Sequence, residues 1–192
     1  MGRIVVTEFI SLDGVMEDPG GAEGFKYGGW TFKIEQGEEG GKFKMEETRD
    51  SAALLLGRVT YQEFAKAWPS QDGEFAHKFN SMPKYVVSST LEKPDWNNST
   101  VLKGDVVKSV SKLKQTQKGD IVVHGSAKLV QTLIANDLVD ELRLMVFPVV
   151  LGSGKRLFGP TTDQKPLRLV DSKTVGDGIA ILIYQQARKE AK

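Results

Sequence analysis

The sequence predicts an α/β fold with three layers, α/β/α, built on a mostly parallel mixed sheet that ends in a C-terminal antiparallel hairpin. Two observations support this prediction. Short apolar runs rich in β-branched residues alternate with segments of helical periodicity through the first three quarters of the chain. Near the C-terminus, residues 167–173 and 179–185 alternate apolar and polar side chains and are joined by a Gly-Asp-Gly turn.

Composition and length narrow the class of protein. The chain has 192 residues, of which 40% are hydrophobic and 27% are charged, as in soluble globular proteins. We expect a single domain at residues 1–187 and a charged tail at 188–192. The net charge of +1 provides no basic field for nucleic acid. The chain has no cysteine, and its two histidines lack the spacing of a zinc site, so we expect no metal.

The beginning of the chain shows no targeting signal. The apolar run in MGRIVVTEFI is too short for a signal peptide or a membrane span. We therefore expect a cytoplasmic protein that does not bind membranes.

An acidic turn follows the first predicted strand, residues 4–10. Asp13 lies in the segment Ser-Leu-Asp-Gly, just past the carboxyl end of this strand. Ligands of open α/β sheets bind at such strand ends, so Asp13 would hydrogen-bond a substrate ring or help to relay a proton. The alternative is that Asp-Gly forms an ordinary turn.

Residues 18–41 are rich in glycine and predict a long loop over the site. Trp30 follows two glycines in this loop and would either stack on a flat heterocycle or cover the edge of the core. Residues 41–51 then predict a short helix. Its three carboxylates are interpreted as a solvated charged face: Glu46, Glu47 and Asp50.

A glycine turn follows the next predicted strand, residues 52–56. The segment Gly57-Arg58-Val59-Thr60 leads into a helix that begins near Thr60, where Thr60-x-x-Glu63 matches a capping box. The first amides of a helix have no partner within the helix, and Arg58 adds a positive charge suited to a phosphate. The alternative is a capped helix with a surface arginine.

Residues 84–88 predict a third strand, which ends in hydroxyl side chains. Ser88 and Ser89 would cap a turn, or would hydrogen-bond a ribose or its 2′-phosphate. A short strand at 100–102 follows. Asp105 then predicts the N-cap of a helix that continues to about residue 115.

The segment 119–154 contains a second strand–glycine–helix turn. Residues 121–123 form a short apolar run, and Ser126 would cap the following helix through its hydroxyl. Gly125 would let an anion approach the backbone at the positive end of that helix. The turn is therefore either a phosphate cradle or an ordinary capped turn. The next strand is predicted at 141–150.

This segment resembles the reductase domain of the bifunctional riboflavin-biosynthesis deaminase-reductase and its stand-alone relatives, which have a dihydrofolate-reductase-like fold. The resemblance lies in the glycine–small-residue turn, in Leu-Val-Asp-Glu-Leu at 138–142 and in Pro-Val-Val-Leu-Gly at 148–152. Ser-Leu-Asp-Gly at 11–14 and Gly-Gly-Trp at 28–30 also resemble this family, so the resemblance covers nearly the whole chain. Val15 departs from it, because deaminase-linked members have a basic residue there. This departure puts the phosphorylated riboflavin precursor in doubt as the substrate.

The resemblance also implies a cofactor. Leu-Leu-Leu-Gly-Arg-x-Thr-Tyr at 54–61 is similar to the dinucleotide-binding segment of dihydrofolate reductases, which bind NADPH. Arg58 and Ser89 together favour NADPH over NADH, because a 2′-phosphate requires cationic and hydroxyl partners. By resemblance, Asp13 would be the catalytic residue and would bind the substrate together with Trp30. The implied cofactor-binding residues are Gly57, Arg58, Thr60, Ser88, Ser89, Gly125, Ser126 and Ala127.

The predicted function is therefore an NADPH-dependent reductase, acting on a pyrimidine- or pteridine-like compound in the manner of 5-amino-6-(5-phosphoribosylamino)uracil reductase. Two alternatives stay open. A dihydrofolate reductase proper would place a helical carboxylate in its pocket, and a non-catalytic NADP-binding sensor would bind the cofactor without turnover. The resemblance also implies a homodimer, with the last strands as the candidate interface.

Overall fold

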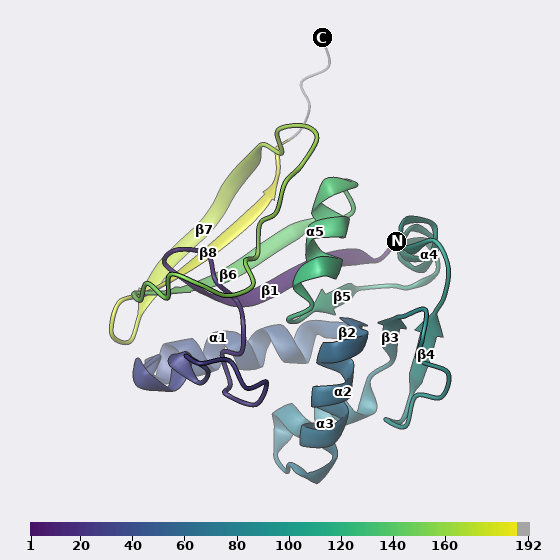
Figure 1. Ribbon diagram of the computed structural model, residues 1–192, viewed down its shortest axis with the longest axis horizontal. Helices are drawn as coiled ribbons and strands as arrows, with labels where there is room; N and C mark the ends of the chain where they lie inside the picture. Colours follow the sequence, from purple (N-terminus) through teal and green to yellow (C-terminus); the bar gives the residue numbers. More distant parts are fainter. Residues whose placement is uncertain (188–192) are drawn as a thin grey trace.

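The computed structural model describes residues 1–187 (Figure 1). The predicted charged tail, 188–192, lies outside the described residues. The strands are β1 (Arg3–Ser11), β2 (Ser51–Gly57), β3 (Lys84–Val87), β4 (Ser99–Leu102), β5 (Asp120–Val123), β6 (Glu141–Phe147), β7 (Leu167–Val175) and β8 (Ile179–Gln186). The helices are α1 (Gly37–Asp50), α2 (Arg58–Ala67), α3 (Glu74–Ser81), α4 (Val106–Thr116) and α5 (Ala127–Ala135), with short 3₁₀ helices at Trp30–Lys33 and Trp68–Ser70.

All eight strands form one sheet in the order β4-β3-β2-β5-β1-β6-β8-β7. The pairs from β4 to β6 are parallel, whereas β6–β8 and β8–β7 are antiparallel. The predicted mixed sheet with a C-terminal antiparallel hairpin is therefore confirmed. The order also places β5 between β2 and β1, so a late part of the chain completes the centre of the sheet.

Helices cover both faces of the sheet, which gives the three predicted layers (Figure 1). On one face, α4 and α5 bury Val110 and Leu133 against residues such as Ile121. On the other face, α1 packs Phe43 beside β6 and β8, and α3 packs Phe79 over β2 and β3. The odd and even residues of each buried strand thus serve two separate cores.

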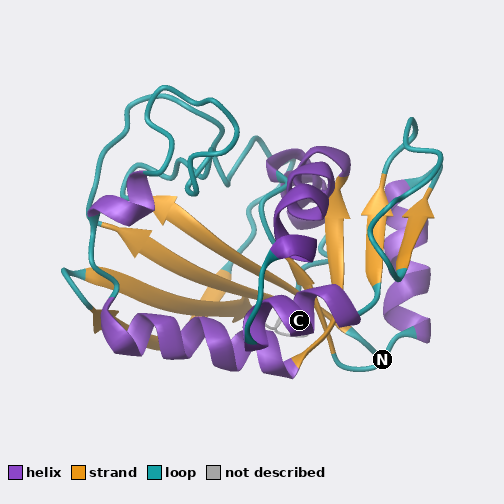
Figure 2. Ribbon diagram, turned by 90° about the horizontal axis from the view of Figure 1, so that it is seen from below, coloured by secondary structure: helices purple, strands orange, loops and turns teal. Residues whose placement is uncertain are grey.

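The longest loops gather at the carboxyl ends of the strands, beyond the arrowheads in Figure 2. The loop after β1 is hydrogen-bonded to the segment after β6. Leu12 donates to the carbonyl of Val149 over 2.8 Å, and Met16 donates to the carbonyl of Lys155 over 2.8 Å. The two loops therefore form one layer at the edge where ligands of such sheets bind.

Several boundaries differ from the prediction. The strand expected at 141–150 ends at Phe147, because Pro148 has no amide hydrogen to continue the ladder. The loop expected at 18–41 contains the 3₁₀ helix at Trp30, and α1 begins at Gly37. The predicted cap at Asp105 is confirmed, since its carboxylate accepts the Lys108 amide over 3.0 Å.

Within residues 1–187, no helix combines the length and apolar character needed to cross a membrane.

Candidate functional site

Three turns that the sequence singles out lie side by side in the structure. The strands β3, β2 and β5 are neighbours and run parallel, so the segments that follow them emerge in a row at one edge of the sheet. These segments carry Ser88 and Ser89, Gly57 and Arg58, and the turn at 125–127. Residues predicted to contact one dinucleotide are therefore brought to one edge from three separate parts of the chain.

Two of these turns are hydrogen-bonded to each other. The Gly57 amide donates to Ser126 Oγ over 2.8 Å, and the Ser126 amide donates to Thr60 Oγ1 over 3.0 Å. The predicted hydroxyl cap of Ser126 on its own helix is therefore wrong, because no such bond forms and Ser126 adopts a left-handed backbone with φ of 61°. The capping box at Thr60 is also wrong, since α2 already begins at Arg58. Each hydroxyl serves the neighbouring turn instead of its own helix.

The turn after β5 presents main-chain amides at the start of α5. Gly125 has φ of 58°, and a Cβ built there would lie 2.9 Å from Thr60 Oγ1. Within residues 1–187, the main-chain amides of Ala127 and Lys128 have no hydrogen-bond partner. These amides stand at the positive end of the α5 dipole. The turn thus combines free donors with partial positive charge, as phosphate-binding turns do, and Gly125 lets it pack closely against Thr60.

The remaining predicted cofactor residues follow β2 and β3. Arg58 is exposed at the start of α2, where its guanidinium donates to Gln62 Oε1 over 3.0 Å. The Ser88 hydroxyl oxygen accepts the amides of Thr90 and Leu91, so it shapes the turn after β3. Ser89 is exposed beside it. A cation and a hydroxyl are therefore available at the β2–β3 end of the row.

Asp13 holds two loops together. Its carboxylate accepts the Ser11 hydroxyl over 2.7 Å and the amides of Leu151 and Gly152 over 3.1 and 2.9 Å. The Ser11 hydrogen bond, followed by the Leu151 amide, lowers the pKa of Asp13 to about 2. Asp13 is therefore ionised at neutral pH and has no proton to donate, while its role toward a substrate stays a prediction.

Trp30 both covers the core and lines a hollow. Its side chain is 2% exposed, its ring meets that of Phe147 edge-on at 5.4 Å, and its Nε1 donates to the carbonyl of Glu17 over 2.9 Å. The same residue borders a hollow of about 440 Å³. The other lining residues are Tyr27, Lys33, Ile34, Pro148, Val149, Val150 and Leu151.

The sequence reasoning missed a buried carboxyl group in β1. Glu8 is 7% exposed, and its Oε2 accepts the Gly125 amide over 3.0 Å, whereas its Oε1 is buried and has no hydrogen-bond partner. Burial raises the pKa of Glu8 well above its ordinary value, and the Gly125 amide and Lys44 only partly oppose this effect. A signal was present in the sequence, because a carboxylate inside the apolar strand RIVVTEFIS is a costly placement that marks a special role.

His124 lies in the turn after β5. Its ring centroid is 5.4 Å from that of Phe79 and 6.3 Å from that of Phe64. Burial, with a smaller contribution from the charge of Lys44, holds the pKa of His124 well below its ordinary value. The ring is therefore neutral at physiological pH.

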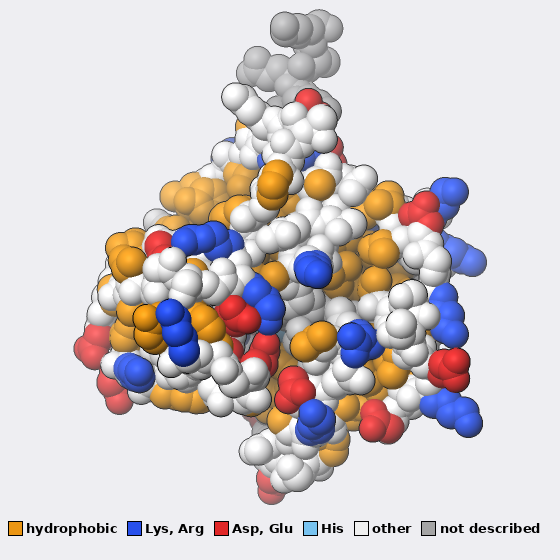
Figure 3. Space-filling view, viewed as in Figure 1, with side chains coloured by type: hydrophobic (Ala, Val, Ile, Leu, Met, Phe, Trp, Pro, Cys, Tyr) orange, Lys and Arg blue, Asp and Glu red, His pale blue; other side chains and the backbone are white. Residues whose placement is uncertain are grey.

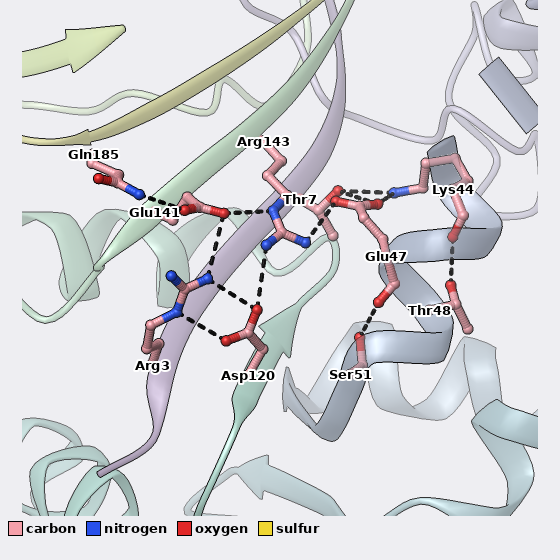
Figure 4. A network of polar contacts seen from close by, with 10 residues as sticks. All are labelled: Arg3, Thr7, Lys44, Glu47, Thr48, Ser51, Asp120, Glu141, Arg143 and Gln185. Atoms are coloured by element: carbon pink, nitrogen blue, oxygen red, sulfur yellow. Dashed lines mark hydrogen bonds and ion pairs between the residues drawn. The ribbon is translucent and has the colours of Figure 1, made fainter. Parts of the chain in front are cut away.

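A network of charged side chains lies between α1 and the sheet (Figure 4). Lys44 Nζ donates to Glu47 Oε2 over 2.6 Å and to Thr7 Oγ1 over 2.8 Å. Arg143 Nη1 lies 3.8 Å from Glu47 Oε1 and continues the network toward Asp120 and Glu141. The prediction of a solvated face is wrong for Glu47, which is 5% exposed, because it points from α1 toward these cations. Glu46 and Asp50 are exposed as predicted.

The surface shows no large area of one charge sign on the face drawn in Figure 3, where acidic and basic side chains are interspersed with hydrophobic ones. Within the described part of the chain, no group of three or more His, Cys, Asp or Glu side chains is arranged to hold a metal ion.

Comparisons with known proteins identify the family and the fold of this chain. The family model of the RibD C-terminal domain matches residues 3–181. The uncharacterized protein YyaP of Bacillus subtilis is 32% identical over 136 residues, which cover 68% of this chain and 72% of YyaP. The uncharacterized protein YwjB of the same organism is 27% identical over 172 residues, which cover 90% of this chain and 91% of YwjB.

Two solved structures share the fold. A protein from Shewanella sp. PV-4 that is named for riboflavin biosynthesis superposes with a TM-score of 0.77 at 22% identity, covering 97% of this chain and 99% of that chain. A pyrimidine reductase-like protein from Corynebacterium diphtheriae superposes with a TM-score of 0.62 at 12% identity, covering 97% and 92% of the two chains. At these identities the likeness establishes the fold alone.

Proposed function

Because the chain belongs to the RibD C-terminal domain family, we propose that it is an NADPH-dependent reductase of a small heterocyclic compound. One observation carries this proposal. Three turns whose sequences predict dinucleotide contacts lie in a row after β3, β2 and β5, and two of them are joined by hydrogen bonds of 2.8 and 3.0 Å. The coincidence of three separate segments at one edge is more specific than any single glycine turn.

The residues present fit a dinucleotide. The free amides at the start of α5 would bind the pyrophosphate. Arg58 and Ser89 would bind the 2′-phosphate of the adenosine end, which selects NADPH over NADH. When bound, the cofactor supplies the hydride, and the protein holds its reactive ring against the substrate and keeps water away.

We place the substrate in the hollow beside Trp30. Its walls combine the rings of Tyr27 and Trp30 with the apolar segment at 148–151, a lining that favours a flat ring. The names of the two structural neighbours refer to riboflavin biosynthesis and to pyrimidine reduction, which supports a pyrimidine- or pteridine-like substrate. Asp13 would act by positioning, because its carboxylate fixes the main chain of Leu151 at the rim.

The geometry of α1 gives less support to a dihydrofolate reductase proper. That reading requires a helical carboxylate available to a ligand. The one buried carboxylate of α1, Glu47, is instead engaged by Lys44 and Thr7 within the described structure. A carboxylate already paired with a lysine offers little to a protonated heterocycle.

A homodimer belongs to the proposal as well. β7 is an edge strand that pairs only with β8 within residues 1–187, and it exposes Leu167 and Leu169 by 39% and 46%. An exposed apolar edge is a natural pairing surface for a second copy. Sedimentation of the wild type and of Leu169→Lys tests this: the wild type should sediment as a dimer and the variant as a monomer.

The experiment that tests the proposed function follows NADPH consumption with a panel of pyrimidine, pteridine and dihydrofolate substrates. We expect oxidation of NADPH with a pyrimidine or pteridine compound that is lost in Arg58→Ala at low cofactor concentration. Binding of NADPH without turnover on any compound would favour the sensor alternative. Turnover of dihydrofolate alone would favour a dihydrofolate reductase.

A further inference from the structure

One polar group at the candidate cofactor site is not used by any predicted contact. This is the carboxyl group of Glu8, of which Oε2 accepts the Gly125 amide over 3.0 Å and Oε1 is buried without a partner. A buried polar atom without a hydrogen bond is costly, so it persists where a ligand or a function compensates for it. The orphaned oxygen lies next to the turn that we assign to the cofactor.

The register of the sheet explains this position. β1 pairs with β5 only as far as Val6 and Val123, whereas it pairs with β6 as far as Ser11. From Glu8 onward, β1 therefore has no strand partner on the side of β5, and Glu8 lies beside the turn after β5, whose Gly125 amide it accepts. A ligand bound at the start of α5 would lie near the Glu8 carboxyl group.

We propose that Glu8 is a ligand-binding residue of the dinucleotide site and that it acts there as a neutral acid. Oε2 accepts the Gly125 amide, and the Oε1 hydroxyl donates a hydrogen bond to an acceptor oxygen of the bound NADPH. The inference rests on the proposed function, because it concerns the same cofactor.

The charges around Glu8 are consistent with the neutral form. The charged groups that act on it are Lys44 and Glu47, both from α1, and they oppose each other. The turn after β5 adds the Gly125 amide and the uncharged His124. Burial outweighs these contributions and raises the pKa of Glu8. An ionised carboxylate would place a negative charge beside bound phosphates, whereas the neutral acid offers one donor and one acceptor.

NADPH affinity should therefore depend on pH. As pH rises through the pKa of Glu8 in the folded protein, the hydroxyl donor is lost and a negative charge appears at the site. Above this pKa, NADPH affinity should fall by as much as about tenfold per pH unit, which is the limit for a single group that must be protonated to bind. Glu8→Gln should not show this fall, since its amide keeps one donor and one acceptor at every pH.

The test is a fluorescence titration with NADPH from mildly acidic to mildly basic pH, applied to wild type, Glu8→Gln, Glu8→Ala and the control Glu46→Gln, whose side chain is exposed on α1. We expect Glu8→Gln to bind like wild type at low pH and more tightly than wild type at high pH. Glu8→Ala should bind about tenfold more weakly at low pH, because it leaves the Gly125 amide and the ligand without this partner. The 2′-phosphate of NADPH also titrates in this pH range. Its effect on the affinity is the part of the pH dependence that all four proteins share.

Infrared difference spectra provide a readout that needs no cofactor. The spectrum of free wild type minus that of Glu8→Gln should show the carbonyl band of a protonated carboxyl group at neutral pH.

NADPH affinities, and slopes of affinity against pH, that are the same for all four proteins would overturn the inference and leave Glu8 as a support for the turn. A carboxylate band in place of the acid band would also overturn it. Absence of NADPH binding by wild type at every pH would overturn the proposed function itself, and this inference with it.

Discussion

The row of turns after β3, β2 and β5 and the loop layer beyond β1 and β6 are built by different means. The row consists of strand–glycine–helix units, each of which spans a few consecutive residues, and hydrogen bonds between Gly57, Thr60 and Ser126 join two of the units. The loop layer has no such units and is held by contacts between distant segments, such as those of Asp13 with Leu151 and Gly152. The turns of the proposed cofactor edge can therefore be identified one by one in the sequence, whereas the hollow beside Trp30 depends on how two loops meet.

This contrast explains why the cofactor can be proposed more specifically than the substrate. Main-chain amides at a helix start bind any phosphate, and their position follows from the fold. A pocket made by loops takes its shape from side chains that vary without changing the fold. Substitutions that affect one region and spare the other test whether the two are separate.

The largest effect is expected outside both regions, in the network between α1 and the sheet. Lys44→Met removes the partner of Glu47, whose side chain is only 4% exposed, and leaves a buried charge. We expect a loss of about 3 kcal/mol in the free energy of unfolding, measured in urea. The double variant Lys44→Met, Glu47→Leu should recover most of this loss. A single variant as stable as wild type would show that the network does not bind α1 to the sheet.

The next largest effect is expected at the cofactor edge, where two glycine variants distinguish backbone strain from loss of ligand binding. Gly125→Ala would place a methyl group 2.9 Å from Thr60 Oγ1 on a backbone with φ of 58°. Gly178→Ala has comparable strain, with φ of 91°, but open space around it. Gly178→Ala should lose about 1–2 kcal/mol of stability from backbone strain, and Gly125→Ala should lose more because its methyl group also overlaps Thr60. Only Gly125→Ala should also lose NADPH binding in a fluorescence titration. Equal NADPH affinity in the two variants would remove this turn from the proposed site.

A smaller effect is expected in the loop layer. The pKa of Asp13 is lowered to about 2 by Ser11 and the Leu151 amide, below its value of 3.8 in the unfolded chain. Its contribution is thus present above pH 3.8 and is lost as pH falls toward 2. Asp13→Asn should cost about 1 kcal/mol at neutral pH, after allowance for solvent screening. The difference from wild type should shrink in acid unfolding curves, while NADPH affinity stays unchanged. Weaker NADPH binding in Asp13→Asn would show that the two regions are coupled.

The prediction from sequence succeeded where neighbouring residues determine the structure. The order of strands and helices, the C-terminal hairpin and the Asp105 cap all follow from periodicity and local hydrogen bonding. The prediction was wrong for Ser126 and Thr60, whose hydroxyls bond to a turn that is close in space and distant in the chain. It missed the burial of Glu47 for the same reason, since Thr7 and Arg143, which contact its carboxylate, come from β1 and β6.

Glu8 was overlooked for another reason. A single carboxylate within an apolar strand was visible in the sequence, but nothing local indicated that β5 would end beside it and leave one of its oxygens without a partner. That fact depends on the register of two strands more than a hundred residues apart. The pairing of distant segments, which no local pattern encodes, thus accounts for the polar groups that the sequence analysis did not identify.

The most direct test of the account is a thermal-shift titration of wild type, Arg58→Ala and the control Lys66→Ala with NADPH and NADH. Lys66 is exposed at the other end of α2 and should have no effect. At a hundred times its dissociation constant, NADPH should stabilise wild type by roughly 2.7 kcal/mol. Arg58→Ala should weaken NADPH binding by about 2 kcal/mol, or about 30-fold, and leave NADH binding unchanged. Absence of stabilisation by either nucleotide, or an equal response of Arg58→Ala and wild type to NADPH, would contradict the assignment of this edge to the cofactor.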